Sequence, residues 1–264
     1  MVRVRISGTK HDMTLRGSVS RDICSDVPYA CPDTSSTWKE TQTTNLDAEF
    51  ECTENDVLTP AKRALLVNDL LPDTLMWLQE TLSVRPVQGP LVLSNPLLES
   101  QCYRENRRDA FMCCEDQMPP SHITDGVENT DIVLYITARP MRSSLAAWAL
   151  TCQQDQYDRP LAGQLNFIPA FLSTSTADRR LQFIKALHEV YHVLGFSDAI
   201  FPDFRQPGDL DQKVETAMRT RTDAKLQKEV TSFVLPNAVS KMKEHFDCFN
   251  LPADVGVELE DHGV

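Results

Sequence analysis

The chain has 264 residues, of which 41% are hydrophobic and 24% charged, and its formal net charge is −12. This length is enough for one large or two modest domains with a substantial core, and the composition is that of an ordinary globular protein. The negative charge and the lack of a basic patch argue against nucleic acid as a partner, and no run of 18 apolar residues could span a membrane.

Residues 1–56 are predicted to form an irregular N-terminal region that contains three cysteines. Met1–Gly8 is typical of a short strand and lacks the apolar segment of a signal peptide. The chain has an even number of cysteines at scattered spacings and no C-x-x-C pair, which is typical of disulfides in an oxidising compartment. The eight cysteines are Cys24, Cys31, Cys52, Cys102, Cys113, Cys114, Cys152 and Cys248.

Residues 57–200 form the second predicted region, and it begins with helices. Thr59 can cap a helix whose first residue is Pro60. Because Pro72 interrupts the apolar pattern, a separate second helix is expected over 74–82. The following stretch, 84–93, contains Gly and Pro between apolar residues, which predicts short strands broken by turns.

A continuous run of β-branched and aromatic residues predicts a buried strand at 131–138, and a second strand is predicted at 161–167, where Pro169 follows it. No Gly or Pro interrupts 177–194, and apolar residues at three- and four-residue steps predict an amphipathic helix over 177–195. We therefore expect an α+β fold, in which a mixed sheet containing both strands packs on this helix. The residues of the predicted apolar stripe are Leu181, Ile184, Leu187, Tyr191 and Leu194.

The end of this helix contains the motif H-E-x-x-H. His188 and His192 are four residues apart, so their side chains share one helix face and two imidazoles can bind one ion. A catalytic zinc ion takes three protein ligands and leaves its fourth position to water. Glu189 could take a proton from that water and pass it to a leaving amine. The motif indicates zinc-dependent peptide hydrolysis, and two partly buried polar histidines are the simpler alternative.

The third predicted region, 201–264, follows a helix stop at Gly195. This stop lets the chain turn below the metal and supply a third ligand from a distance. Charged residues dominate 210–233, which favours a solvated helix or a flexible insertion. A final helix is expected over 237–246, before an acidic tail.

The stretch H-E-V-Y-H-V-L-G-F-S resembles the leishmanolysin family of zinc proteases. Further similar segments extend from about residue 50 to the C-terminus, so the resemblance covers most of the chain. These segments are 52–59 with Lys62-Arg63, 126–138, Cys152, Arg159-Pro160 with Gly163 and Asn166, 245–248 and 259–261.

The resemblance implies a zinc endopeptidase of the metzincin type, which hydrolyses internal bonds of protein or peptide substrates. His188 and His192 match the first two zinc ligands of the family, and Glu189 matches its general base. By resemblance, 161–167 or its neighbour lines the cleft in which an extended substrate adds to the sheet. The resemblance also implies disulfides, secretion or attachment to a cell surface, and contacts with cell-surface or matrix proteins, since some relatives act in cell adhesion.

The sequence leaves the third zinc ligand open between three positions. The metzincin pattern has a histidine three residues after the glycine, where this chain has Asp198, and a carboxylate can bind zinc. In the leishmanolysin family the third histidine comes later, after an insertion of several dozen residues. We favour a histidine beyond Val264, in a longer protein of which this chain is the middle, over His262 as a displaced substitute and over Asp198.

Three functions follow from these patterns, and the zinc endopeptidase is the favoured one. The second is a catalytically inactive extracellular adhesion or binding protein of the same fold. The third is an intracellular protein that binds no zinc and keeps its thiols reduced. A peptidase assay that responds to a zinc chelator separates the first two, and eight free thiols would identify the third.

Overall fold

The computed structural model describes residues 2–3, 6–7, 37–39, 49–94, 119–141, 144–223, 227–252 and 255–259. Contacts divide the chain into two compact units, Met1–Gly195 and Phe196–Val264. Much of the predicted cysteine-containing region 1–56 lies outside the described residues, and the boundaries of the three predicted regions stay a prediction. Outside the described residues are also Cys24, Cys31, Cys102, Cys113, Cys114 and His262.

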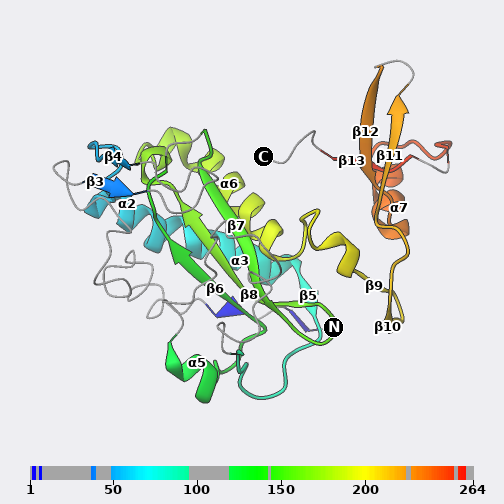
Figure 1. The fold of residues 1–264 in the computed structure, drawn as a ribbon, viewed down its shortest axis with the longest axis horizontal. Helices are drawn as coiled ribbons and strands as arrows, with labels where there is room; N and C mark the ends of the chain where they lie inside the picture. The colour runs from blue at the N-terminus through cyan, green and yellow to red at the C-terminus, as the bar shows by residue number, and fades with distance from the viewer. Residues whose placement is uncertain are drawn as a thin grey trace. The chain divides into compact units, whose positions relative to one another are not determined.

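A four-stranded mixed sheet forms the centre of the first unit (Figure 1). Its strand order is β2-β6-β8-β7, with β6 parallel to both β2 and β8 and β7 antiparallel to β8. Strands β6 and β8 confirm the two predicted strands, and the expected α+β fold is confirmed. The bounds are β2 Ile6–Ser7, β6 Ile132–Thr137, β7 Ala147–Gln154 and β8 Pro160–Phe167.

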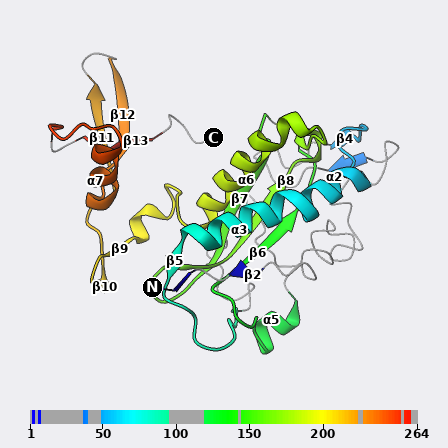
Figure 2. The same ribbon diagram turned by 180° about the vertical axis from the view of Figure 1, so that it is seen from behind.

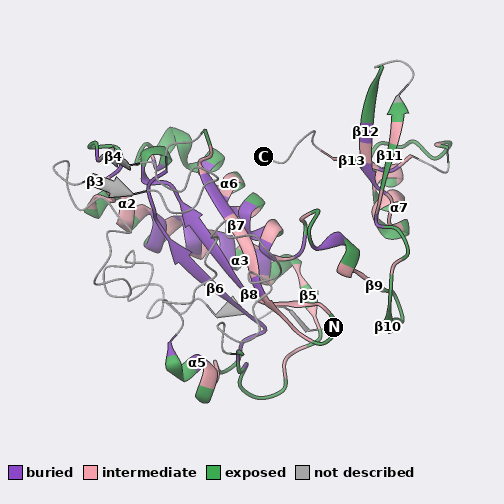
Figure 3. Ribbon diagram, viewed as in Figure 1, coloured by how far each residue is buried: buried purple, intermediate pink, exposed green. Residues whose placement is uncertain are grey.

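Both faces of this sheet are covered, so its central strands are buried (Figure 3). Side chains alternate between the two faces along a strand, with a period of two residues. In β6, Ile132, Leu134 and Ile136 therefore belong to the core beneath the helices. Val133 and Tyr135 belong to the opposite core, which also contains Leu91 and Leu93.

One long helical run covers the first face: α2 Pro60–Ala64, the π-helical turn η1 Leu65–Leu70 and α3 Leu71–Thr81. Its start confirms the prediction, because Thr59 caps the helix and Pro60 is its first residue. The predicted break at Pro72 is wrong. A proline lacks the N–H that an α-helical turn needs, and here the widened turn η1 just before it lets the helix continue.

Helix α6 (Arg179–Val193) lies beside α3 on the same face of the sheet and packs on β7 and β8 (Figure 2). The helix was predicted, but its buried side was not: Leu181, Ile184 and Tyr191 of the predicted apolar stripe are exposed. Three of the buried residues, Ala186, Val190 and Val193, are small or β-branched, and Val193 lies where the helix approaches Gly163 of the sheet closely. The buried residues are Gln182, Ala186, Glu189, Val190 and Val193.

Short elements complete the first unit. Of the strands predicted in 84–93, the structure has only β5 and a single bridge between Leu91 and Val127. Strand β1 pairs with β5, and β3 pairs with β4. The bounds are β1 Val2–Arg3, β3 Thr37–Lys39, β4 Glu49–Glu51, β5 Ser83–Val84, α5 Pro120–Thr124, η3 Pro169–Phe171 and η4 Thr176–Asp178.

The second unit contains an antiparallel sheet, so the prediction of a solvated helix or insertion over 210–233 is wrong. Alternating threonines give strands with one polar, solvated face, and the charges obscured this two-residue period. Phe201 and Phe233 form its core. The bounds are η5 Phe201–Asp203, β9 Arg205–Gln206, β10 Asp209–Lys213, β11 Met218–Asp223, β12 Lys228–Phe233, α7 Pro236–His245 and β13 Val257–Glu258.

Helix α7 agrees with the final helix predicted over 237–246. None of the helices in the described parts of the chain has the length and apolar character needed to cross a membrane. 

Candidate metal and catalytic site

The C-terminal end of α6 positions the candidate site residues. The helix ends at Val193, and the N–H of Leu194 donates to the Val190 carbonyl at 2.9 Å. The N–H of Gly195 donates to the His192 carbonyl at 3.1 Å, and Gly195 has a φ of 105°, in the region that glycine favours. The predicted helix stop at Gly195 is therefore confirmed.

The two histidines of the motif converge on one point. Their Nε2 atoms lie 3.0 Å apart, and one Nε2–H donates to the other nitrogen across this distance. The ring centroids are 4.6 Å apart and the rings are nearly perpendicular, at 87°. His188 is exposed and His192 half-buried, so the pair is accessible from solvent.

This arrangement fits two of the ligand positions of a tetrahedral zinc ion. With Zn–N distances of about 2.0–2.1 Å, two imidazole nitrogens in such a site lie about 3.3–3.4 Å apart. The separation of 3.0 Å is a few tenths of an ångström shorter, and a small rotation of the exposed His188 ring can make up that difference. The residues present therefore fit a shared ion through their Nε2 atoms.

Glu189 lies on the buried side of the same helix, where its side chain is only 8% exposed. Desolvation disfavours the ionised carboxylate and raises the pKa of Glu189 to about 7. A cation bound by the neighbouring histidines would favour the carboxylate form and lower that pKa again.

An apolar surface flanks His188 on its exposed side. Ile184 and Tyr191 lie one turn before and one turn after it on the helix and are both exposed. The ring of Trp77, in α3, packs edge-on against Tyr191 with centroids 6.3 Å apart. Burial of the phenol raises the pKa of Tyr191, so its hydroxyl stays neutral at physiological pH.

Strand β7 lies next to this end of α6, and sequence reasoning missed it. Its sequence, Ala147–Gln154, is rich in Ala and Gln, which are weak strand formers. The signal that could have identified it is the alternation of Ala147, Ala149 and Thr151, the first two of which pack into the core below the helix. The Oγ1 of Thr151 donates to the Val193 carbonyl at 2.8 Å. Because β7 is last in the strand order, it is the neighbour of β8 at the edge of the sheet.

The candidates for a third ligand stay predictions. Within the described ranges, no three His, Cys, Asp or Glu side chains gather so that they could hold a metal ion. Asp198 belongs to the second unit, where it is exposed and its Oδ1 accepts the N–H of Ala199 at 2.7 Å. His262 lies beyond the last described residue.

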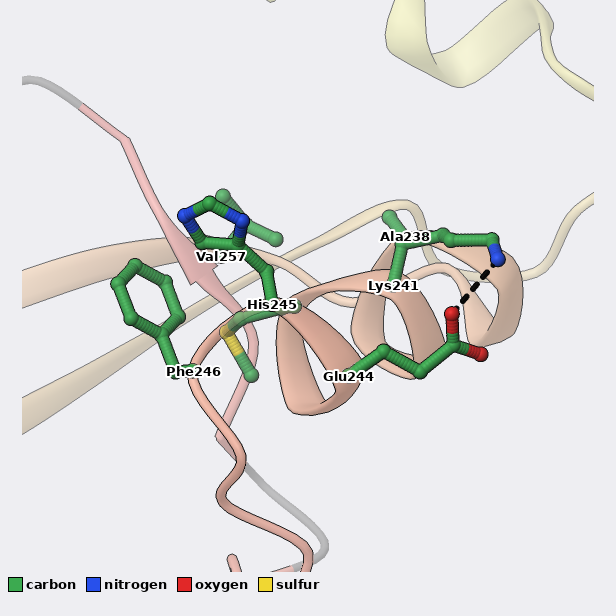
Figure 4. A pocket seen from close by; sticks show the side chains of 7 residues that line it. Ala238, Lys241, Glu244, His245, Phe246 and Val257 are labelled. Carbon is green, nitrogen blue, oxygen red and sulfur yellow. Dashed lines mark hydrogen bonds and ion pairs between the residues drawn. The ribbon is translucent and has the colours of Figure 1, made fainter.

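A hollow in the second unit contains another histidine (Figure 4). It has a volume of about 640 Å³ and lies between α7 and β13. His245 and Phe246 lie together on one side, with ring centroids 4.7 Å apart. On the other side, Glu244 forms an ion pair with Lys241 at 2.7 Å. The Glu244 carboxylate is thus paired with a lysine, and His245 is the single histidine among the described residues that line the hollow.

Comparisons with known proteins identify a family for the chain. The family model described as Leishmanolysin, a peptidase family, matches residues 6–264. A leishmanolysin homolog of Crithidia fasciculata is 32% identical over 249 residues, which cover 94% of this chain and 33% of that protein. The leishmanolysin of Leishmania donovani is 31% identical over 250 residues, covering 94% of this chain and 37% of that protein.

A relative of lower identity is matched over a smaller share of this chain. The leishmanolysin-like peptidase of Drosophila melanogaster is 27% identical over 263 residues, covering 75% of this chain and 38% of that protein. The chain therefore spans about a third of the length of the curated relatives it matches. Since the family model covers nearly the whole chain, the chain belongs to the leishmanolysin family of peptidases.

Proposed function

We propose that this chain carries the core of a zinc-dependent metalloendopeptidase. The observation that supports the proposal most directly is the convergence of the His188 and His192 Nε2 atoms, 3.0 Å apart at the end of α6. Membership of a peptidase family supports the same reaction class. Because the chain spans about a third of its relatives, the activity of the whole protein is part of the proposal.

In this proposal each residue of the motif has a separate task. When bound, zinc acts as a Lewis acid and lowers the pKa of a water molecule to about 7. His188 and His192 hold the ion through Nε2, and the fixed spacing of one helical turn keeps both nitrogens on the same point. A carboxylate oxygen of Glu189 accepts the proton of the nucleophilic water and then donates it to the leaving amine nitrogen.

The substrates we propose are proteins or peptides that bind in an extended conformation. Strand β7 supports this, because it is last in the strand order of its sheet and is tied to the end of α6 through Thr151. An extended segment can pair with the backbone of such a strand and adopt a fixed register. Its peptide groups would then be spaced regularly along β7, near the histidine pair.

We also propose that the protein works outside the cell or at a cell surface, with disulfides and with cell-surface or matrix proteins as partners. The scattered spacing of the eight cysteines supports disulfides in an oxidising compartment. Of the described cysteines, Cys52 is buried and Cys248 has an exposed free thiol. Surface biotinylation or recovery from the medium, in cells that express the natural protein, would test the location.

The function is tested by cleavage of an unstructured protein such as casein, with and without a zinc chelator. We expect cleavage that stops with the chelator and returns with added zinc. Glu189→Gln should keep zinc but lower kcat by roughly 10²–10⁴, the usual contribution of a general base. The matched control is Glu244→Gln, which removes an exposed carboxylate paired with Lys241 and should leave kcat unchanged.

Three outcomes would argue against parts of this proposal. Full activity of Glu189→Gln would remove Glu189 from the mechanism. Cleavage that persists in the chelator would exclude zinc. A folded protein that binds zinc and cleaves nothing would instead be a catalytically inactive binding relative.

A further inference from the structure

We infer that Thr151 in strand β7 is a positioning residue for His192, because it fixes the last turn of α6 to the sheet through Val193. The inference rests on the proposed function in one respect, which is that His192 binds a metal ion. It assigns a task to a residue outside the H-E-x-x-H motif and 41 positions before His192.

The first observation is the hydrogen bond from Thr151 to the helix. The last carbonyl groups of a helix have no partner within it. The Val190 and His192 carbonyls accept from Leu194 and Gly195, but the Val193 carbonyl accepts from the Thr151 Oγ1, at 2.8 Å. The sheet thereby binds the helix at the residue that directly follows His192.

The second observation is a close approach at the same residue. Gly163 in β8 faces Val193, and a Cβ added to this glycine would lie 2.1 Å from Cγ1 of the valine and 2.8 Å from Cγ2. Real Cβ atoms do not come this close to other carbon atoms, so only glycine fits there. Thr151 and Gly163 are also direct partners in the β7–β8 ladder.

The pairing register of β7 with β8 shifts directly after Thr151. Thr151 pairs with Gly163, but Gln153 pairs with Ala162, so Cys152 is an extra residue between them. Such a bulge bends the strand and changes the direction of its side chains, and bulges are common beside active sites. The regular part of β7 therefore stops at the residue that holds α6.

Together these contacts hold the last helical turn at two points. The hydrogen bond ties the Val193 carbonyl to β7, and the contact with Gly163 limits how closely the Val193 side chain approaches the sheet. His192 shares this turn, whereas His188 lies one turn earlier, so a shift of the last turn changes the Nε2–Nε2 separation of 3.0 Å. Accurate ligand spacing thus depends on the hydroxyl of Thr151.

The test compares Thr151→Val, which keeps the shape and removes the hydroxyl, with Thr151→Ser, which keeps the hydroxyl. Cobalt(II) serves as the probe, and its affinity and visible absorption spectrum are measured by titration of the full chain. We expect about fivefold to tenfold weaker binding and an altered spectrum for Thr151→Val, from the loss of one hydrogen bond. Thr151→Ser should stay within about twofold of the unchanged protein.

The matched control is Thr74→Val in α3. Thr74 is buried and its hydroxyl donates to the Leu70 carbonyl at 2.7 Å, so the same chemical change removes a similar bond from another helix. This variant should bind cobalt as the unchanged protein does. A drop of equal size in both valine variants would overturn the inference, because it would reflect general stability.

A second measurement does not require a metal. Hydrogen exchange of the Leu194 and Gly195 amides reports on the last turn of α6, and we expect faster exchange in Thr151→Val with no change at the start of the helix. If exchange in Thr151→Val is unchanged, Thr151 does not anchor the last turn of α6. If exchange is faster but cobalt affinity is unchanged, Thr151 anchors the turn but does not position His192. If the unchanged protein binds no cobalt or zinc, the proposed function fails, and exchange alone decides whether Thr151 anchors the turn.

Discussion

The Lys62 Nζ donates a hydrogen bond to the Pro169 carbonyl, at 2.8 Å across 107 positions of the chain. The same nitrogen donates to the Asn55 carbonyl at 2.9 Å. Partial burial lowers the pKa of Lys62, and the nearby Asp56 carboxylate opposes this shift. One ammonium group thus joins the start of the long helical run to the turn that follows β8.

Lys62→Met should lower the free energy of unfolding by about 1–3 kcal/mol, because it removes two bonds from a charged donor to backbone carbonyls. Urea unfolding followed by circular dichroism measures this change. Lys241→Met is the control, since Lys241 is 78% exposed and its pair with Glu244 should contribute at most about 0.5 kcal/mol. Equal losses in the two variants would show that the two bonds from Lys62 to backbone carbonyls stabilise the protein no more than an exposed ion pair does.

Gly163→Ala should destabilise the protein by about 1–3 kcal/mol, because the new methyl group overlaps Val193. Val193→Ala removes the overlapping atoms, so the double variant should be more stable than the sum of the two single changes predicts. A double-mutant cycle in urea measures this coupling, expected at about 0.5–3 kcal/mol. Strict additivity would contradict direct contact between the two residues.

Zinc should stabilise the protein through the histidine pair. A ligand present at 100 times its Kd raises the free energy of unfolding by about 2.7 kcal/mol. His192→Ala should lose most of this increase, because a single imidazole remains at the site. His245→Ala, which changes an exposed histidine of α7, should retain it. Unfolding after dialysis, with and without zinc, compares the three proteins, and equal stabilisation of all of them would place the zinc elsewhere.

The buried Glu189 carboxyl should make the stability of chelator-treated protein depend on pH. Its pKa is raised from 4.5 to about 7 in the folded state, so between these values the folded protein binds more protons than the unfolded one. Its contribution is therefore fully present below pH 4.5 and is lost as the pH rises through about 7. The expected loss is roughly 3 kcal/mol, from a shift of about 2.5 pH units at about 1.36 kcal/mol for each unit.

Glu189→Gln is the control for this pH effect, since an amide does not titrate and the histidines remain unchanged. The difference in stability between the two proteins should widen in favour of the glutamine variant from pH 5 to pH 8. Parallel pH profiles would mean that the Glu189 carboxyl titrates normally.

Much of the fold could be predicted from the sequence where a single pattern dominates. Strand β6 is a continuous run of apolar and β-branched residues, and α6 combines helical periodicity with a stop at Gly195. The same helix shows what sequence patterns do not predict. The close approach of α6 to Gly163 places Val193 on the buried side, whereas hydrophobicity alone favoured Leu181 and Ile184, which are exposed.

The candidate site, like the fold, could be predicted from the sequence only in part. The spacing of His188 and His192 predicts their convergence because both lie on one regular helix. Thr151 could not be predicted as their support, since its position depends on the pairing of β7 with β8 and on the bulge at Cys152. Such long-range contacts have no local signature in the chain.

The bulge in β7 has a further consequence for how the protein behaves in concentrated solution. Among the described strands, β7 has a partner on one side only, and the backbone groups of such an edge can pair with another copy of the protein. The irregularity at Cys152 shortens the stretch that a second molecule could match, while residues before it keep a regular ladder. The bulge thus limits self-association through β7 and leaves the regular residues before it for the short extended substrate proposed above.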